Sequence, residues 1–275
     1  ELTYWQSASD FYSCRESEGL DRLSETALLA ARQALNATST ALKVLRLQGL
    51  LLEQAGRRKE ALAAYKRGVE LVCPKFDTDP YLQTFQSGAL KISRNEPTGY
   101  ELLTAFAGWV RLTSMDVEDS ARRGFDLIES LADSLPYDSH CRAAAMICLA
   151  LAYRGHVEAS RRAEHWSRAC GSTSLLSGAL VYRILLDEDI FSESRRTQLM
   201  ESFELVESLP QGEFRLTVQL LVAEGLLRSN IPMLRPRAEM LIRRAGLTRS
   251  HPQYRTVGDE NILWLPSDWQ RSLNE

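Results

Sequence analysis

The sequence contains no long apolar run, no visible leader and few residues that break helices. No stretch approaches the roughly 18 to 20 consecutive apolar residues that cross a bilayer, so we expect no membrane association. The chain does not open with a basic segment followed by an apolar core, and we therefore predict no signal peptide. With 15 glycines and 9 prolines among 275 residues, breakers are fewer than average, which favours helices.

Motifs of catalysis and metal binding are also absent from the sequence. There is no glycine-rich phosphate loop, no HExxH and no GxSxG. The five cysteines are scattered without a CxxC spacing, which argues against zinc and favours free thiols in a reducing compartment, the cytoplasm. His140 and Cys141 are adjacent and would point about 100° apart on a helix, so they cannot work together as base and nucleophile. We predict no catalytic residue, no cofactor and no metal.

The charge of the chain is nearly balanced. The 33 Lys and Arg residues against 36 Asp and Glu residues give a formal net charge of −3. This balance argues against a dedicated nucleic-acid-binding protein but is compatible with a local basic patch. Apolar residues make up 44% of the chain and charged residues 25%, as in soluble globular proteins.

Residues 41–74 have the pattern of two helices joined by a tight turn. Apolar residues recur at helical spacing in both halves of this segment. Gly56 separates the halves, and Pro74 closes the second one. The pattern predicts two helices of about four turns that pack antiparallel to each other.

The same segment resembles a tetratricopeptide repeat. The residues that carry the resemblance are small or aromatic, namely Gly49, Gly56, Ala61, Tyr65 and Gly68. Small residues let two helices approach closely, and the resemblance implies that Tyr65 fills the space between adjacent helix pairs. It further implies a right-handed solenoid whose first helices line a concave surface.

The remaining chain repeats the helix-pair pattern less strictly. Predicted stops at Pro136, Gly171, Pro210 and Gly246 recur every 35 to 39 residues, a period typical of helix-pair solenoids. We therefore predict an all-α protein, a right-handed α-solenoid of about six antiparallel helix pairs over residues 1–246, with the best-matching repeat at 41–74. Residues 247–275 form a predicted C-terminal extension that docks on or caps the last pair. Its Trp264 and Trp269 either cover the end of the solenoid or bind a partner.

Sequence signals also mark individual positions in the predicted pair after the first. Asp116 is a predicted N-cap. Ala121 and Phe125 repeat the spacing of Ala61 and Tyr65, which predicts a packing role for Phe125.

The resemblance places five candidate partner-binding residues on the exposed face of the first helix of the best-matching repeat. They are Lys43, Arg46, Leu50, Glu53 and Gln54. Leu50 stands where some tetratricopeptide proteins have the Asn of a carboxylate-binding clamp, so we do not expect that clamp here. The mixture of apolar and charged side chains fits an amphipathic helix or an extended peptide. The alternative is that Leu50 packs on a neighbouring helix.

Pairs of arginines recur in the second helices of the predicted pairs. They are Arg57-Arg58, Arg122-Arg123, Arg161-Arg162, Arg195-Arg196 and Arg243-Arg244. If the helix pairs stack, these arginines form a basic ridge for phosphates or an acidic protein segment, with Arg161 and Arg162 as candidate contacts. The alternative is a solvated outer face, because glutamates are interspersed among them.

The sequence as a whole predicts a non-catalytic scaffold or adaptor that binds a protein or peptide in a concave groove. One alternative is a sensor module of a larger signalling or transcription regulator, in which a peptide or small ligand shifts the packing between repeats. A weaker alternative is a nucleic-acid-binding solenoid that uses the arginine ridge.

Overall fold

The computed structural model describes residues 4, 6–8, 17–23, 37–55, 57–74, 76, 98–186, 192–209, 219, 222–223, 226 and 232–247. All regular structure among these residues is helical and none of it is strand, which confirms the predicted all-α class. None of the described helices is both long enough and apolar enough to span a lipid bilayer.

The helices follow one another with short connections through the middle of the chain. They are α3 (Ala37–Gln54), α4 (Arg58–Glu70), α6 (Thr98–Leu112), α7 (Val117–Ser130), α8 (Tyr137–Tyr153), α9 (Val157–Ala169), α10 (Thr173–Leu186), α11 (Ser192–Ser208) and α13 (Arg235–Leu247), with 3-10 turns η1 (Ala132–Ser134) and η2 (Pro232–Leu234). The sequence predicts helices at about 139–154, 157–170, 172–186 and 192–209, and these agree with α8, α9, α10 and α11 to within two residues at each end. Helix α13 continues through Gly246, which we predicted to end it.

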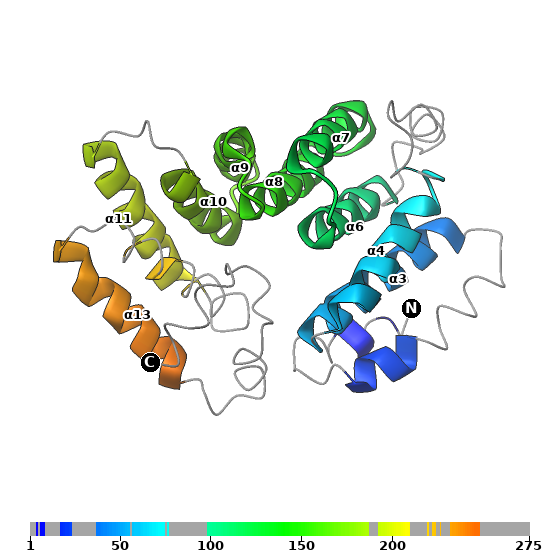
Figure 1. Cartoon of the computed structure of the whole chain (residues 1–275), viewed down its shortest axis with the longest axis horizontal. Helices are drawn as coiled ribbons and strands as arrows, with labels where there is room; N and C mark the ends of the chain where they lie inside the picture. The colour runs from blue at the N-terminus through cyan, green and yellow to red at the C-terminus, as the bar shows by residue number, and fades with distance from the viewer. Residues whose placement is uncertain are drawn as a thin grey trace.

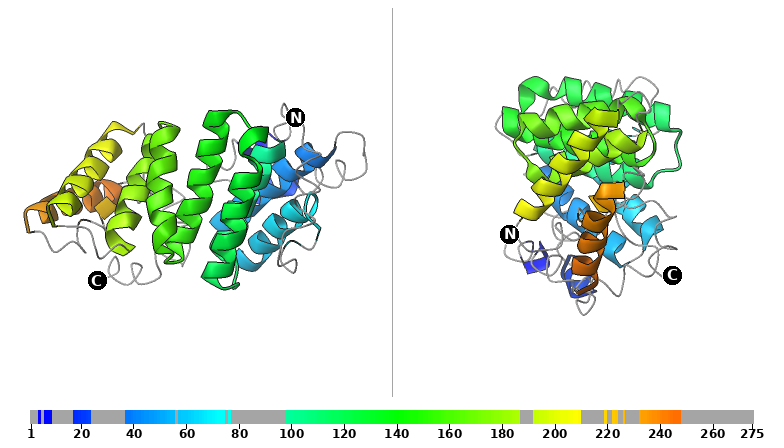
Figure 2. Two further views of the ribbon diagram at one scale, coloured as in Figure 1. Left: turned by 90° about the horizontal axis from the view of Figure 1, so that it is seen from above. Right: turned by 90° about the vertical axis from the view of Figure 1, so that its left-hand side faces the viewer.

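We group the helices in consecutive pairs, α3–α4, α6–α7, α8–α9 and α10–α11. The first helix of each later pair packs against both helices of the pair before it. Helix α3 packs against α4 and α6, α6 packs against α4 and α8, and α8 packs against α9 and α10. The helices lie along one curve, with α6, α8 and α10 on its inner side and α7 and α9 on its outer side (Figure 1). Seen from above, they lie side by side in a row (Figure 2).

The ends of the central helices are set by residues that the sequence marks. The Asp116 carboxylate accepts hydrogen bonds from the backbone N–H groups of Glu118 (2.9 Å) and Asp119 (3.3 Å), which confirms it as the N-cap of α7. Gly155 and Gly171 follow α8 and α9 with φ angles of +93° and +61°, a left-handed conformation that favours glycine. These residues turn the chain sharply, so that α8, α9 and α10 pack beside one another.

Tyr65 occupies the joint between the α3–α4 pair and α6. Its side chain is 1% exposed. The ring lies so close to Gly49 of α3 and Gly108 of α6 that a Cβ atom on these glycines would come within 2.4 Å and 2.6 Å of a ring atom. This confirms the prediction that Tyr65 fills the space between adjacent pairs, and it explains why both contact positions carry glycine.

Phe125 packs against the core, as predicted, but it is less buried than Tyr65. The small residue of α7 that faces the next helix is Gly124, where a Cβ atom would lie 3.0 Å from Ile147 of α8. Phe125 follows Gly124 in sequence, so its side chain is turned by about 100° around the helix, and it is half-buried. Its packing partners are the guanidinium of Arg162 and the ring of His156, both from the next pair.

Candidate binding surfaces

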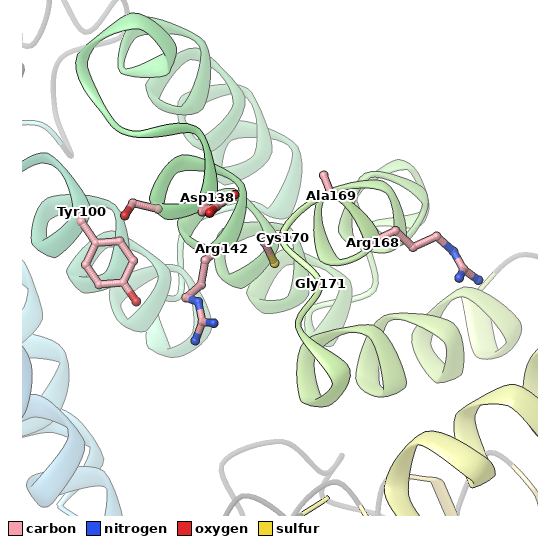
Figure 3. Close-up of a pocket in the computed structure, with 8 residues that line it drawn as sticks. Tyr100, Asp138, Arg142, Arg168, Ala169, Cys170 and Gly171 are labelled. Atoms are coloured by element: carbon pink, nitrogen blue, oxygen red, sulfur yellow. The ribbon is translucent and has the colours of Figure 1, made fainter. Parts of the chain in front are cut away.

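A hollow of about 680 Å³ lies where the N-terminal turns of α6 and α8 meet the C-terminal end of α9. We call it the inner hollow. Its lining residues are Tyr100, Asp138, Ser139, Arg142, Arg168, Ala169, Cys170 and Gly171. The side chains of Tyr100 and Arg142 point in the same direction, toward the inner side of the curve (Figure 3).

Arg142 is a cation of the inner hollow that the other described residues leave unpaired. Its exposed side chain makes no hydrogen bond or ion pair with any of them, and neither does the carboxylate of Asp138, one turn earlier on α8. Arg168, in contrast, is held by Glu201 through hydrogen bonds of 2.7 and 2.9 Å and by Glu164 at 3.1 Å. A free donor and a free acceptor one helical turn apart match the carbonyl and N–H groups of an extended peptide.

Two of the predicted first-helix residues make contacts within the chain. Arg46 donates from Nε to Glu101 of α6 (2.6 Å) and from Nη2 to the Tyr4 hydroxyl (3.3 Å). Leu50 is half-buried and packs against an apolar cluster that includes Leu23 from the helical segment 17–23. This partial burial is in keeping with the alternative that Leu50 has a packing role, which the sequence left open.

Glu53 is buried, so the prediction that it is exposed is wrong. Its carboxylate pairs with Arg111 of α6, whose side chain is 5% exposed, and accepts a 2.6 Å hydrogen bond from the Tyr65 hydroxyl. Burial and the charge of Glu53 raise the pKa of Tyr65 well above its ordinary value. Burial lowers the pKa of Arg111, but the charges of Glu53 and Tyr65 and the hydrogen bond to Glu53 act together against it, so the net shift is upward. Glu53 thus joins three helices and is not accessible to a partner.

The structure gives less information on the other predicted partner-binding residues. Lys43 is half-buried on α3. Gln54 is the last residue of α3, and its side chain lies outside the described residues. Trp264 and Trp269 also lie outside the described residues, as does the rest of the predicted extension after Leu247.

A second hollow, of about 360 Å³, lies between α7 and α9 on the outer side of the curve. We call it the outer hollow. Its lining residues are Phe125, Ile128, Glu129, Glu158, Arg161, Arg162, His165 and Trp166. The structure thus brings together the two predicted arginine contacts, and both approach Glu158, at 4.0 Å from Arg161 and 3.1 Å from Arg162.

The predicted arginine ridge is interrupted on α7. Arg123 is 6% exposed, and its guanidinium donates to the backbone oxygen of Phe76. Of the Arg122-Arg123 pair, only Arg122 is exposed, and it forms an ion pair with Asp119 at 3.1 Å. Arg57, Arg122, Arg161 and Arg162 each pair with an acidic residue of their own helix or helix start, as the alternative of a solvated outer face predicts. The side chains of Arg243 and Arg244 lie outside the described residues.

Sequence reasoning missed the residues of the inner hollow. Asp138 and Arg142 stand four residues apart in the first turns of a largely apolar helix, and that spacing places them on one face. The sequence of α8 alone is therefore sufficient to identify these two residues as a polar pair on one face of the helix. Tyr100 carries no comparable signal, because its place beside Arg142 depends on how α6 packs on α8.

Within the described residues, no group of three or more His, Cys, Asp or Glu side chains is arranged to hold a metal ion. Cys73, Cys141, Cys148 and Cys170 are free thiols. Burial raises the pKa of Cys148 to about 12, which keeps it protonated and unreactive near neutral pH. Comparisons of the chain with models of protein families, with curated proteins and with solved structures found no match.

Proposed function

We propose that the chain is a non-catalytic protein-interaction scaffold whose inner side binds an extended peptide of a partner protein. We further propose that it is built as a right-handed solenoid similar to tetratricopeptide repeats. Two observations support a repeated packing unit. The first helices of successive pairs contact one another, and Tyr65 lies between Gly49 and Gly108. The right hand of the solenoid comes from the resemblance alone.

The observation that carries the binding proposal is the unpaired donor and acceptor of the inner hollow. Arg142 and Asp138 project from α8, most of which is buried between its neighbours. Because the backbone of α8 is held by its neighbours, binding has to order only the side chains of these two residues and not the backbone that carries them. Tyr100 adds a half-buried ring from α6 as an apolar contact.

Capture of partners from a cell extract tests this function with two matched charge reversals. Arg142→Glu reverses the unpaired cation of the inner hollow, and Arg122→Glu reverses an exposed arginine on α7. We expect the unmodified chain and Arg122→Glu to retain a common set of proteins, and Arg142→Glu to lose it while melting at the same temperature. Capture of the same set by Arg142→Glu, or of no specific protein by the unmodified chain, would contradict the proposal.

The inner hollow also favours the sensor alternative, because its walls come from two successive pairs. Tyr100 belongs to α6, whereas Arg142 belongs to α8. A peptide that bridges these helices favours one relative position of the pairs over others. Fluorescent labels at the exposed positions Ala63 of α4 and Glu204 of α11 distinguish the two functions. A sensor changes the energy transfer between the labels when a captured peptide binds, and a passive scaffold leaves it unchanged.

A further inference from the structure

The outer hollow has an apolar floor with aromatic side chains. Ile128 at its floor is 4% exposed, and Phe125 and Trp166 are half-buried. These three side chains come from α7 and α9, which belong to successive pairs. An apolar hollow with half-buried aromatic walls accepts a large side chain of a partner as an anchor.

The guanidinium of Arg162 stands beside this floor in a fixed orientation. It stacks over Phe125 at 4.0 Å from the ring centroid, and its Nε donates to Glu158 at 3.1 Å. Its two Nη groups make no hydrogen bond with another described residue, and the side chain is 41% exposed. A guanidinium that is already oriented and has free Nη groups binds a carboxylate through two parallel hydrogen bonds.

The two rims of the outer hollow carry opposite charge. On the α9 rim, Glu158 engages only the Nε group of Arg162, so the two Nη groups of this cation still face the hollow. On the α7 rim, Glu129 is exposed and makes no ion pair with a described residue. A carboxylate on an occupant is attracted to α9 and repelled from α7, so the charges fix the direction in which the occupant lies.

We propose that the outer hollow binds a peptide segment of a partner protein in which a carboxylate stands next to a large apolar side chain. The apolar side chain fills the floor between α7 and α9, and the carboxylate accepts hydrogen bonds from the Nη groups of Arg162. A nucleic acid fits less well, because Glu129 and Glu158 would face its row of phosphates. This site is separate from the inner hollow and does not depend on it.

Selection of a random peptide library against the full chain tests the proposal. We expect enriched peptides in which Asp or Glu stands beside Leu, Phe or Trp. Arg162→Gln should weaken their binding about ten- to a hundredfold, the range for hydrogen bonds to a charged group. Arg162→Lys keeps the positive charge but lacks the two parallel N–H donors of a guanidinium. We expect its affinity for the peptides to lie between those of the unmodified chain and Arg162→Gln. Arg122→Gln, on the neighbouring helix but outside the hollow, should leave binding unchanged.

A second variant keeps the test valid if changes at Arg162 disturb the fold. Glu129→Gln leaves Arg162 in place and removes the repulsion from the α7 rim, so it should tighten the binding of the same peptides. Enriched peptides without carboxylates would overturn the proposal. So would a labelled oligonucleotide that binds more tightly than the peptides through Arg162. Peptides that depend on Arg142 instead of Arg162 would overturn it while supporting the function proposed for the inner hollow.

Discussion

The buried ion pair of Glu53 and Arg111 predicts a large effect from a small substitution. Glu53→Gln keeps the size of the side chain and an acceptor for the Tyr65 hydroxyl, but it removes the charge beside Arg111. The guanidinium of Arg111, 5% exposed, is then buried without a counterion. Breaking a buried pair in this way costs about 3 to 5 kcal/mol. At about 2 to 4 °C per kcal/mol, the melting temperature should fall by about 6 to 20 °C.

Glu60→Gln is the matched control for this experiment. Glu60 also pairs with an arginine, Arg57, at 2.6 Å, but the side chains are 57% and 50% exposed. Water and salt screen that pair, so we expect no measurable change in the melting temperature. Scanning calorimetry of the unmodified chain and the two variants compares one substitution in a buried and an exposed setting. If Glu53→Gln melted like Glu60→Gln, the reasoning from buried charge would be refuted.

A double replacement separates charge from packing at the same position. Glu53→Leu combined with Arg111→Met removes both charges and fills the space with apolar atoms. Such replacements of buried pairs are often neutral or stabilising. The double variant should therefore melt closer to the unmodified chain than Glu53→Gln does. A larger fall in the double variant would mean that the hydrogen bond from Tyr65, and not the charge balance, holds this joint.

Three further predictions concern single positions, each measured by thermal melting. Ala61→Trp overpacks the fully buried start of α4 and should cost about 1 to 3 kcal/mol or more, whereas Ala63→Trp on the exposed face of the same helix should not change the melting temperature. Asp116→Ala removes the N-cap of α7 and should cost about 1 kcal/mol, and full retention of stability would contradict the cap. Burial lowers the pKa of His140, so the unfolded chain takes up this proton first and the fold loses stability as the pH drops below about 6.5. His140→Phe should reduce the fall in melting temperature between about pH 7 and pH 5. If the melting temperature of this variant depended on pH as that of the unmodified chain does, a lowered pKa of His140 would be contradicted.

The limits of the central helices are predictable from the sequence because their causes are local. Asp116 caps α7 through backbone groups two and three residues further along the chain. Gly155 and Gly171 end helices through their own φ angles. Each cause acts within one turn of the chain, so a pattern of residue types is sufficient to find it.

Local sequence patterns do not predict whether a charged side chain faces solvent or another helix. Glu53 is buried because Arg111 lies opposite it, and these residues are 58 positions apart. Arg46 reaches Glu101 over 55 positions. The partner comes from the next helix pair, and finding it requires the rotation of one helix against another. For this reason the sequence identifies Arg46 and Glu53 as polar positions but assigns both to a solvent-exposed face.

Among the described residues, polar bridges link the successive helix pairs from α3–α4 to α10–α11, and these bridges bear on both hollows. Arg154, which follows the last residue of α8, donates to the Ser120 hydroxyl and to the Met115 backbone oxygen, and this ties the end of α8 to the preceding pair. Glu164 of α9 pairs with Arg183 of α10 at the following joint. Apolar surfaces tolerate small sliding movements, whereas a directional hydrogen bond that is partly shielded from water keeps its geometry over a narrower range of positions. We infer that these bridges fix the angle between pairs. Because each hollow takes its walls from two pairs, the same bridges hold the proposed binding groups at a constant spacing.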